Sequence, residues 1–189
     1  HWAELADLLR LPGKAHRETP SASLEIPEDS MHRADSHGPP TGIDPVGLAQ
    51  KLSATVLDDH DATYRGTWQK GHGLQGYVGY GYRYAKPGSD ATATFTLQSP
   101  ETGSYDVLIA WQPHPNRGNT VPVSVRSTNT ETETTMNMKN APSIQNSFGS
   151  VGRMNLTKGE KITVTIGTKD AGGLAHADAV LLVPRIPNN

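Results

Sequence analysis

A period of two runs along two neighbouring stretches of this chain, strictly apolar–polar in the first and with Leu108 and Ala110 also apolar in the second. In residues 90–97, threonines separate the apolar residues Ala91, Ala93, Phe95 and Leu97. In the stretch that follows, the alternating apolar residues are Tyr105, Val107, Ile109 and Trp111. Because successive side chains of a strand point to opposite faces, this spacing predicts two strands with one face toward a core. The turn residues Pro-Glu-Thr-Gly at 100–103 predict that the two strands form a β-hairpin.

Eight further stretches have a strand-like pattern bounded by turn residues: 54–58, 63–68, 77–84, 121–127, 132–138, 148–155, 161–167 and 177–183. The chain has 19 glycines, 14 prolines and only 34% hydrophobic residues, which favours short strands with many turns over long helices. Short strands bury their apolar faces most economically in two packed sheets. We therefore predict an all-β fold, an antiparallel β-sandwich with jelly-roll topology, over residues 54–184.

The residues before and after the predicted sandwich have a different composition. Residues 1–13 contain apolar residues at helical spacing and then Pro12-Gly13, which predicts a short helix left from an upstream region. Residues 14–53 are rich in Pro, Ser and charged residues, as linkers are. Residues 185–189 form a short tail. Since the chain begins with His1, we expect it to be part of a longer precursor.

Charge and composition exclude several classes of partner and chemistry. The 17 basic residues nearly balance the 19 acidic ones and no basic run stands out, so we expect neither nucleic acid nor an anionic membrane as partner. No run approaches the ~20 apolar residues that a membrane span requires. The absence of cysteine excludes disulfides, thiolate catalysis and cysteine metal sites.

The sequence lacks the Walker A loop, the G-x-G-x-x-G and G-x-S-x-G motifs and H-E-x-x-H, so we predict no enzyme activity and no cofactor for this chain. An enzyme would need His176 and Asp178, or His60 and its neighbouring aspartates, to converge with another acid in a pocket.

Asp58, Asp59, His60 and Asp61 form the one acidic cluster that suggests a metal. Aspartates are common in turns for backbone reasons alone, so a surface turn is one interpretation. A cation site at Asp58, Asp59 and Asp61 is the other. Calcium would be the ion, because it prefers carboxylate and carbonyl oxygens.

Aromatic residues give a more specific signal for binding. The segment GYVGYGYRYA contains Tyr77, Tyr80, Tyr82 and Tyr84, the last three on one face of a strand, and Trp68 and Trp111 lie at the ends of predicted strands. Aromatic rings stack on the apolar faces of sugars. The same side chains are also what a sandwich with only two Phe and three Trp would use to fill its core. Both interpretations stay open from the sequence.

The loop at residues 111–120 combines polar side chains at a strand end, where functional residues often lie. Asn116 and Arg117 could bind sugar hydroxyls, or a uronic acid carboxylate in a bidentate manner. Alternatively, Arg117 could hold the loop together by donating to backbone carbonyls.

Several stretches together resemble the golvesin and xanthan-lyase C-terminal carbohydrate-binding-like domain. They are VLDDHDATYRGTW, GYVGYGYRYA, SDATATFTL, GSYDVLIAW, NRGNTVPVSV, SFGSVGRMNL and HADAVLLVP, in this order over residues 54–184. The resemblance implies a non-catalytic sandwich, similar to carbohydrate-binding modules, at the C-terminus of larger extracytoplasmic bacterial proteins such as polysaccharide lyases and FAD-dependent oxidoreductases. One departure is Phe148, where the family often has Trp.

Two functions follow as expectations. In the first, the domain holds its parent protein on an extracellular polysaccharide, neutral or acidic. Its contacts would be Trp68, Tyr77, Tyr80, Tyr82, Trp111, Asn116, Arg117 and His176. In the second, it is a structural domain that docks onto upstream domains of its parent or onto copies of itself, using threonine-rich faces at 92–96 and 128–135.

Overall fold

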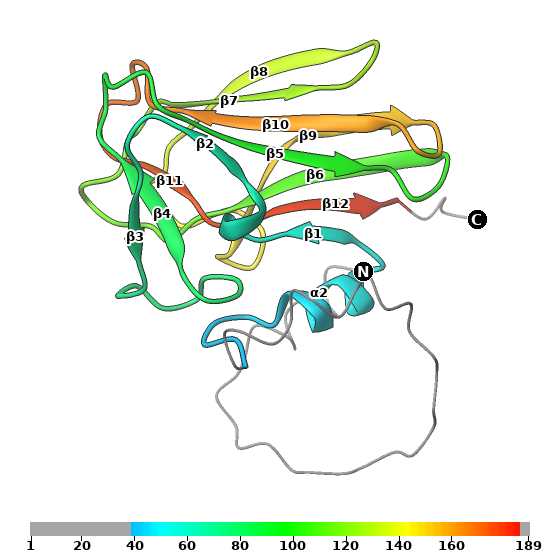
Figure 1. The fold of residues 1–189 in the computed structure, drawn as a ribbon, viewed down its shortest axis with the longest axis horizontal. Helices are drawn as coiled ribbons and strands as arrows, with labels where there is room; N and C mark the ends of the chain where they lie inside the picture. The colour runs from blue at the N-terminus through cyan, green and yellow to red at the C-terminus, as the bar shows by residue number, and fades with distance from the viewer. Residues whose placement is uncertain (1–38, 186–189) are drawn as a thin grey trace.

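The computed structural model describes residues 39–185, which fold into layered antiparallel sheets (Figure 1). The four-stranded sheet has the order β1 (Thr55–Leu57), β12 (Val180–Pro184), β6 (Gly103–Ala110), β9 (Phe148–Leu156). The five-stranded sheet has the order β2 (Thr63–Arg65), β5 (Thr92–Gln98), β10 (Lys161–Gly167), β7 (Val121–Arg126), β8 (Glu131–Met136). A three-stranded sheet at one end has the order β11 (Ala175–Ala177), β4 (Tyr82–Ala85), β3 (Gln69–Gly71).

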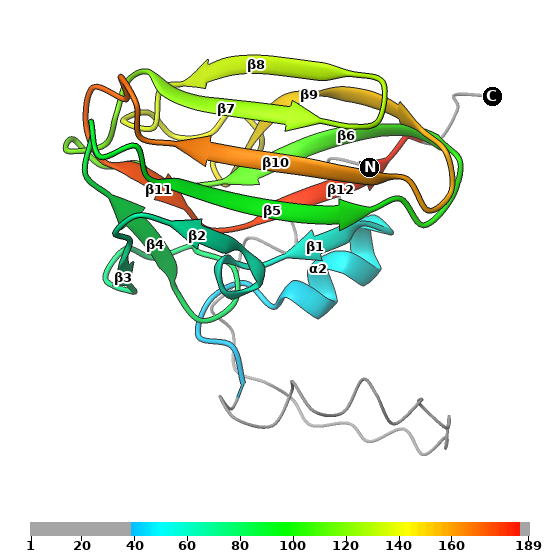
Figure 2. The ribbon, with the colours of Figure 1, turned by 45° about the horizontal axis from the view of Figure 1, so that its top comes forward.

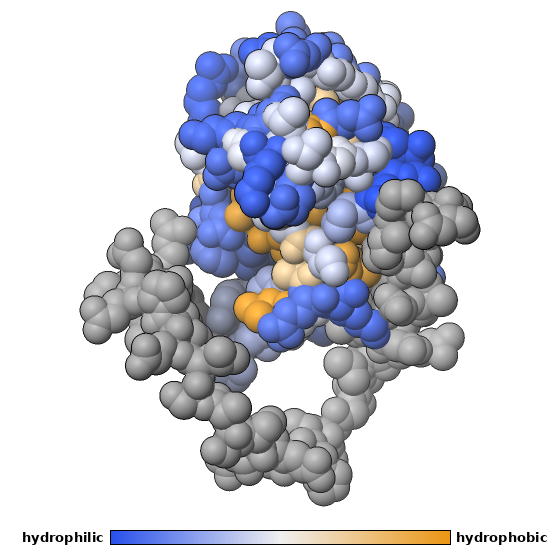
Figure 3. Space-filling view, turned by 90° about the vertical axis from the view of Figure 1, so that its right-hand side faces the viewer, coloured by the Kyte–Doolittle hydropathy of each residue, from blue (hydrophilic) through white to orange (hydrophobic). Residues whose placement is uncertain are grey.

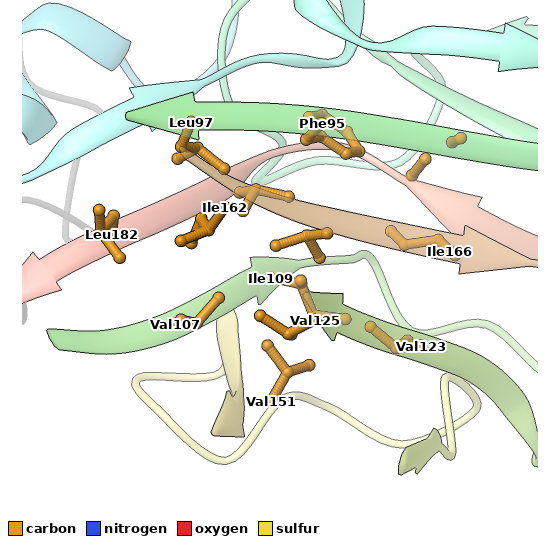
Figure 4. Packing of buried hydrophobic residues seen from close by; sticks show 14 of the residues in the cluster. Phe95, Leu97, Val107, Ile109, Val123, Val125, Val151, Ile162, Ile166 and Leu182 are labelled. Atoms are coloured by element: carbon orange, nitrogen blue, oxygen red, sulfur yellow. The ribbon is translucent and has the colours of Figure 1, made fainter. Parts of the chain in front are cut away.

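The core lies between the two larger sheets, where alternate residues of each strand meet (Figure 4). The five-stranded sheet contributes Phe95, Leu97, Val123, Val125, Ile162 and Ile166, and the four-stranded sheet contributes Val107, Ile109, Val151 and Leu182. All of these side chains are at most 5% exposed. The threonines between the apolar residues of β5 are more exposed, as the period of two requires. The predicted antiparallel β-sandwich is therefore confirmed.

The hairpin predicted between residues 90–97 and 105–111 is wrong. Strand β5 pairs with β2 and β10, whereas β6 pairs with β12 and β9. The turn at 99–102 thus carries the chain from one sheet to the other. Alternation reveals which face of a strand is buried, but it does not reveal which strand completes the hydrogen bonds at its edges.

Two of the predicted strands are divided in the structure. Within 77–84, only Tyr82 onward joins a strand, because Val78 forms a parallel bridge with Ile43 instead. Within 177–183, the chain passes from β11 to β12, which belong to different sheets, and Asp178 lies at the break. These two breaks make Tyr82 the first residue of β4 in the three-stranded sheet and place Asp178 directly after β11 of the same sheet.

Helix α2 (Pro45–Leu52) lies in the last part of the stretch expected to be a linker up to residue 53. Asp44 caps this helix by accepting hydrogen bonds from the backbone N–H groups of Val46 and Gly47. Leu48 and Leu52 are fully buried in a second apolar cluster against the outer face of the four-stranded sheet. The packed domain therefore begins before residue 54. The short helix expected at 1–13 lies outside the described residues.

Figure 3 shows one face of the molecule, coloured by hydropathy. Most of the upper part of that face is hydrophilic, and apolar residues show mainly in its lower part, at the level of β1, β12 and α2 in Figure 1. One 3-10 turn, η2 (Asp59–Asp61), links β1 to β2. Within residues 39–185, no helix has the length and apolar character to cross a membrane.

Candidate functional site

The three-stranded sheet separates two groups of polar side chains. Tyr82 and Tyr84 of β4 point to one face and Arg83 points to the other, because residues two apart share a face. His176 of β11 is the direct neighbour of Tyr84 in the register, and its ring stacks on Tyr82 with centroids 4.4 Å apart. One face of this small sheet is therefore lined by aromatic rings.

Arg117 lies over this aromatic face and is only 4% exposed. Its Nε–H donates to Nδ1 of His176 at 3.0 Å, and Nη1 donates to Oδ1 of Asn116 at 3.1 Å. The guanidinium carbon lies 5.8 Å from the ring centroid of Tyr82 and 5.6 Å from that of Tyr84, within reach of cation–π attraction. We call Arg117, His176, Tyr82 and Tyr84 the arginine cluster.

The loop that carries Arg117 is fixed by backbone hydrogen bonds. The N–H of Arg117 donates to the carbonyl of His114 at 3.0 Å, which closes a turn. The N–H of Gly118 donates to the carbonyl of Leu174 at 2.9 Å. In turn, the N–H of Leu174 donates to the carbonyl of Asn116 at 3.0 Å. Because both sides of the loop are paired with the segment before β11, Arg117 is held in place before any ligand arrives.

The hydrogen bond to His176 fixes the protonation state of the cluster. Because a guanidinium N–H can only donate, Nδ1 of His176 accepts and the ring proton lies on Nε2. Burial, together with the positive charge of Arg117, holds the pKa of His176 well below its usual value. The buried Nε2 atom has no hydrogen-bond partner within the described chain. The histidine is thus neutral, and Arg117 supplies the charge of the cluster.

Arg117 differs from four of the other described arginines in having no acidic partner, and from Arg65, which is exposed, in being buried. Carboxylates pair with Arg83, Arg126, Arg153 and Arg185. Within residues 39–185, no carboxylate lies within salt-bridge distance of Arg117, although it is far more buried than these four. Burial lowers the pKa of Arg117, but a guanidinium keeps its charge in proteins. The cluster therefore contains a buried cation that is not compensated.

The rim of the cluster is open to solvent. Asn116 and His114 are exposed, and His114 Nδ1 lies 2.7 Å from Oδ1 of Asn116. Tyr84 is half-buried. An incoming group at this rim would meet a cation, an amide and part of an aromatic ring.

On the opposite face of the same sheet, Arg83 is paired. Its Nε–H donates to Oδ2 of Asp59 at 3.1 Å, and its guanidinium lies 4.5 Å from the ring centroid of Tyr64. Asp59 belongs to the turn η2, whose first residue is held by a capping box between Asp58 and Asp61. The aspartates of this turn therefore stabilise local structure.

The same turn is the candidate metal site. One ligand atom from each of Asp58, Asp59 and His60 lies within 4.8 Å of the others. However, Asp58 already accepts from the N–H of Asp59 at 2.8 Å and lies 3.0 Å from His60, and Asp59 accepts from Arg83. Calcium takes six to eight oxygen ligands. The donor set of this turn therefore suits hydrogen bonds better than it suits calcium.

Burial dominates the electrostatics of these acids. It raises the pKa of Asp58 to about 6, against the hydrogen bonds from Asp59 and His60 that lower it. The pKa of Asp59 is raised in the same way. Asp178, fully buried, accepts from the N–H of Val78 and from Nε2 of Gln112 at 3.0 Å, and burial raises its pKa well above the usual value. Asp178 therefore holds the loop before β4 at Val78, and Asp58 and Asp59 bond within their turn and to Arg83, so these acids do not form an open acid–base pair with His176.

With the geometry established, comparison with known proteins identifies the family. The family model of the golvesin C-terminal domain matches residues 55–184. The chain belongs to this family. The family resemblance that the sequence predicted is thus confirmed, over nearly the same residues.

Comparison with individual proteins supports the same family assignment for this golvesin C-terminal domain. A xanthan lyase of Bacillus sp. (strain GL1) is 28% identical over 170 residues, which cover 86% of this chain but only 17% of the lyase. The solved structure of a Paenibacillus xanthan lyase has a TM-score of 0.64 and 26% identity, covering 77% of this chain and 14% of the lyase. This chain thus spans a small part of the length of these lyases.

A smaller protein shares the fold over nearly its whole length. A family 35 carbohydrate binding module from Clostridium thermocellum matches with a TM-score of 0.51 at 13% identity, covering 70% of this chain and 98% of the module. The golvesin C-terminal domain therefore has a β-sandwich fold similar to that of carbohydrate-binding modules, which are non-catalytic.

The structure brings together only some of the predicted binding residues. Tyr82, Asn116, Arg117 and His176 meet in the arginine cluster and at its rim. Trp68 lies elsewhere: it is half-buried against Tyr64, with ring centroids 5.5 Å apart. Tyr80 is also half-buried.

Several predicted aromatic platforms are interior residues, which contradicts a direct stacking role. Tyr77, Tyr82 and Trp111 are each 5% exposed, and His176 is not exposed. The buried polar atoms of the three aromatic residues have partners, as buried groups require: Thr41 for Tyr77, the N–H of Leu74 for Tyr82 and the carbonyl of Asn140 for Trp111. Phe148 is likewise fully buried. The core interpretation of these aromatic residues therefore holds.

Two rim residues, Tyr84 and His114, were not among the predicted glycan contacts. Tyr84 follows Tyr82 by two positions and so shares its face, a signal that the sequence does contain. His114 gives no signal of its own, because its role depends on the turn that brings it to Asn116.

Proposed function

We propose that this domain holds a larger extracytoplasmic protein on an acidic polysaccharide, and that a sugar carboxylate binds beside Arg117. The observation that carries the proposal is the uncompensated charge of this buried arginine. Removing a cation from water without an ionic partner is costly. An anion that binds at the rim would offset this cost, so the cluster favours an anionic ligand over a neutral one.

The neighbours of Arg117 suit a sugar that carries a carboxylate. A guanidinium can bind both oxygens of a carboxylate. Oδ1 of Asn116 faces Arg117 and His114, which leaves the amide hydrogens of Asn116 for ligand oxygens. The accessible part of Tyr84 offers an apolar surface to a sugar ring. Because the site is open, we expect modest affinity, with Kd of about micromolar to millimolar.

The comparisons support this proposal in two ways. Two relatives of this chain are xanthan lyases, which by their name act on a polysaccharide, and the fold is similar to that of a carbohydrate binding module. An extracytoplasmic location would place the domain where such polymers occur.

Affinity gel electrophoresis with xanthan and polygalacturonate, each also in carboxyl-reduced form, tests the proposal. We expect the native gels to retard the domain and the carboxyl-reduced gels to retard it much less. Equal retardation by both forms would show that the carboxylate is not recognised, and no retardation by any acidic polysaccharide would refute the proposal.

The most informative variant is Asn116→Asp, which places a carboxylate where the Asn116 oxygen already accepts from Arg117. We expect it to abolish retardation, because the arginine then has an internal partner and the new charge repels the ligand. Asn129→Asp makes the same change at another exposed asparagine and serves as the control. If both variants bind like the wild type, Arg117 is not the contact.

Burial of Tyr77, Tyr82, Trp111 and His176 favours a second candidate function, a docking domain that binds its parent protein and no glycan. In that case, the domain would bind the rest of the parent protein when mixed as separate chains, or would self-associate in sedimentation experiments, and no polysaccharide gel would retard it.

A further inference from the structure

The outer face of the five-stranded sheet is a hydroxyl surface. The register places Thr63, Thr94, Thr165, Ser124 and Glu133 in one row across its five strands. The hydroxyl oxygens of Thr94 and Thr165 lie 3.4 Å apart. In Figure 2 this sheet lies toward the viewer, and no other described element covers it. The row is therefore accessible, with neighbouring strands about 4.8 Å apart.

This face is hollowed near the edge formed by β7 and β8. The hollow has a volume of about 510 Å³, which lies within the roughly 300–1,000 Å³ of small-ligand pockets. Its lining includes Pro122, Ser124, Glu133, Thr135, Thr165 and Gly167. Gly167 contributes by having no side chain, since a Cβ there would come within 3.2 Å of Pro122. The hollow is thus built from strands rather than from mobile loops.

The chemistry of the hollow differs from that of the arginine cluster. Each hydroxyl can both donate and accept a hydrogen bond, whereas the carboxylate of Glu133 only accepts. No aromatic or basic side chain belongs to its lining. An anion would be repelled by Glu133, and an apolar ligand would leave the hydroxyls unpaired. A neutral ligand with many hydroxyl groups is not repelled by Glu133 and can form hydrogen bonds with the hydroxyls of the hollow.

We propose that this hollow is a second glycan site, which binds a neutral sugar chain lying across β10, β7 and β8. Hydroxyls of the chain donate to Glu133 and exchange hydrogen bonds with Ser124 and Thr165. Recognition here uses hydrogen bonds without aromatic stacking and does not require the arginine cluster. A second copy of the domain is a weaker occupant, because stable protein interfaces have an apolar centre that this face lacks.

Affinity gels with glucomannan, galactan and dextran test the proposal, using the full chain. We expect at least one of these neutral polymers to retard the wild type, and Asn116→Asp to bind it equally well. Thr165→Lys fills the hollow and should weaken binding about tenfold. Thr163→Lys is the matched control, because Thr163 lies on the same face of β10 but outside the hollow.

Glu133→Gln gives a second test that does not fill the hollow. Losing the charged acceptor should weaken binding about fivefold, as expected for one hydrogen bond to a charged group. The proposal is overturned if none of the three polymers binds, if Thr165→Lys and Thr163→Lys behave alike, or if sedimentation shows a dimer that Thr165→Lys disrupts. The gels with xanthan and polygalacturonate test binding at Arg117 separately, so failure of one proposal can be distinguished from failure of the other.

Discussion

Two arginines on opposite faces of the three-stranded sheet have the same kind of neighbours but different electrostatic environments. Arg83 and Arg117 each lie over tyrosine rings. Arg83 also pairs with Asp59 at 3.1 Å, whereas Arg117 is more buried and donates only to neutral groups, His176 and Asn116. The difference teaches that one of these two arginines has its charge matched within the fold and the other does not, and the second is the one that our proposal assigns to an external anion.

Replacing each arginine with methionine should give the largest contrast. Arg83→Met leaves Asp59 buried without its cation, so we expect the free energy of unfolding to fall by about 4 kcal/mol. Arg117→Met leaves His176 without a donor but also removes a desolvated charge, so we expect a loss of only about 1 kcal/mol. Urea denaturation measures both values. If Arg117→Met lost more unfolding free energy than Arg83→Met, the comparison between the two arginines would be contradicted.

The acidic face should also dominate the pH dependence of stability. Burial raises the pKa of Asp58 from 3.8 to about 6, so the folded state binds this proton more tightly than the unfolded chain does. Its contribution is fully present below about pH 4 and is lost as the pH rises through 6. The free energy of unfolding of the wild type should therefore fall between these two pH values. We expect Asp58→Asn to reduce this fall by up to about 3 kcal/mol.

Urea denaturation from pH 4 to pH 8 checks the slope. The raised pKa values of Asp59 and Asp178 act in the same direction, so the variant should keep part of the decline. Arg117→Met is the control with an unchanged acidic face. Stability that rises with pH in the wild type would contradict this account.

Giving Arg117 a partner should make it resemble Arg83. In Asn116→Asp, the new carboxylate can accept from Nη1 of Arg117, and we expect stability at pH 7 to rise by about 1 kcal/mol. Thermal unfolding of this variant and of Asn129→Asp measures the effect. A gain of equal size in both variants would indicate a general charge effect and not pairing with Arg117.

The smallest effect concerns metal at the aspartate turn. Because Asp58 and Asp59 already accept hydrogen bonds from the chain, we expect EDTA or added calcium to change the melting temperature by less than about 1 °C. Differential scanning calorimetry of the metal-stripped domain, with and without calcium, is the measurement. If calcium clearly raised the melting temperature of the wild type but not that of Asp58→Asn, a cation site at this turn would be established.

Sequence alternation predicted most of the sandwich because burial on one face of a strand is a local property. Residues 92–98, 121–126 and 161–167 form strands close to the predicted bounds. Strand pairing depends on residues that are far apart in the chain. The same pattern therefore could not show that the chain crosses from one sheet to the other at 99–102. Helix α2 was assigned to a linker because its two buried leucines are too few for a clear amphipathic pattern.

The candidate site was predictable in its residue types but not in its electrostatics. The loop of Asn116 and Arg117 and the tyrosines of β4 stand out in the sequence. The burial of Tyr82 and the pairing of Arg117 with His176 depend on contacts across 35 and 59 positions of the chain, which local patterns do not contain. For the same reason, the sequence did not show that Arg83 has a carboxylate partner and that Arg117 has none.

The short bridge between Ile43 and Val78 has a mechanical consequence if the domain serves as a tether. Within residues 39–185, this bridge is the first backbone pairing that tension from the N-terminal side reaches, and it comprises three hydrogen bonds of 2.8–2.9 Å among residues 42–43 and 77–79. Helix α2 lies next in the line of force. Both can peel away while the nine strands of the two larger sheets stay paired. This segment would then act as an extensible link that yields under load before the anchored domain unfolds.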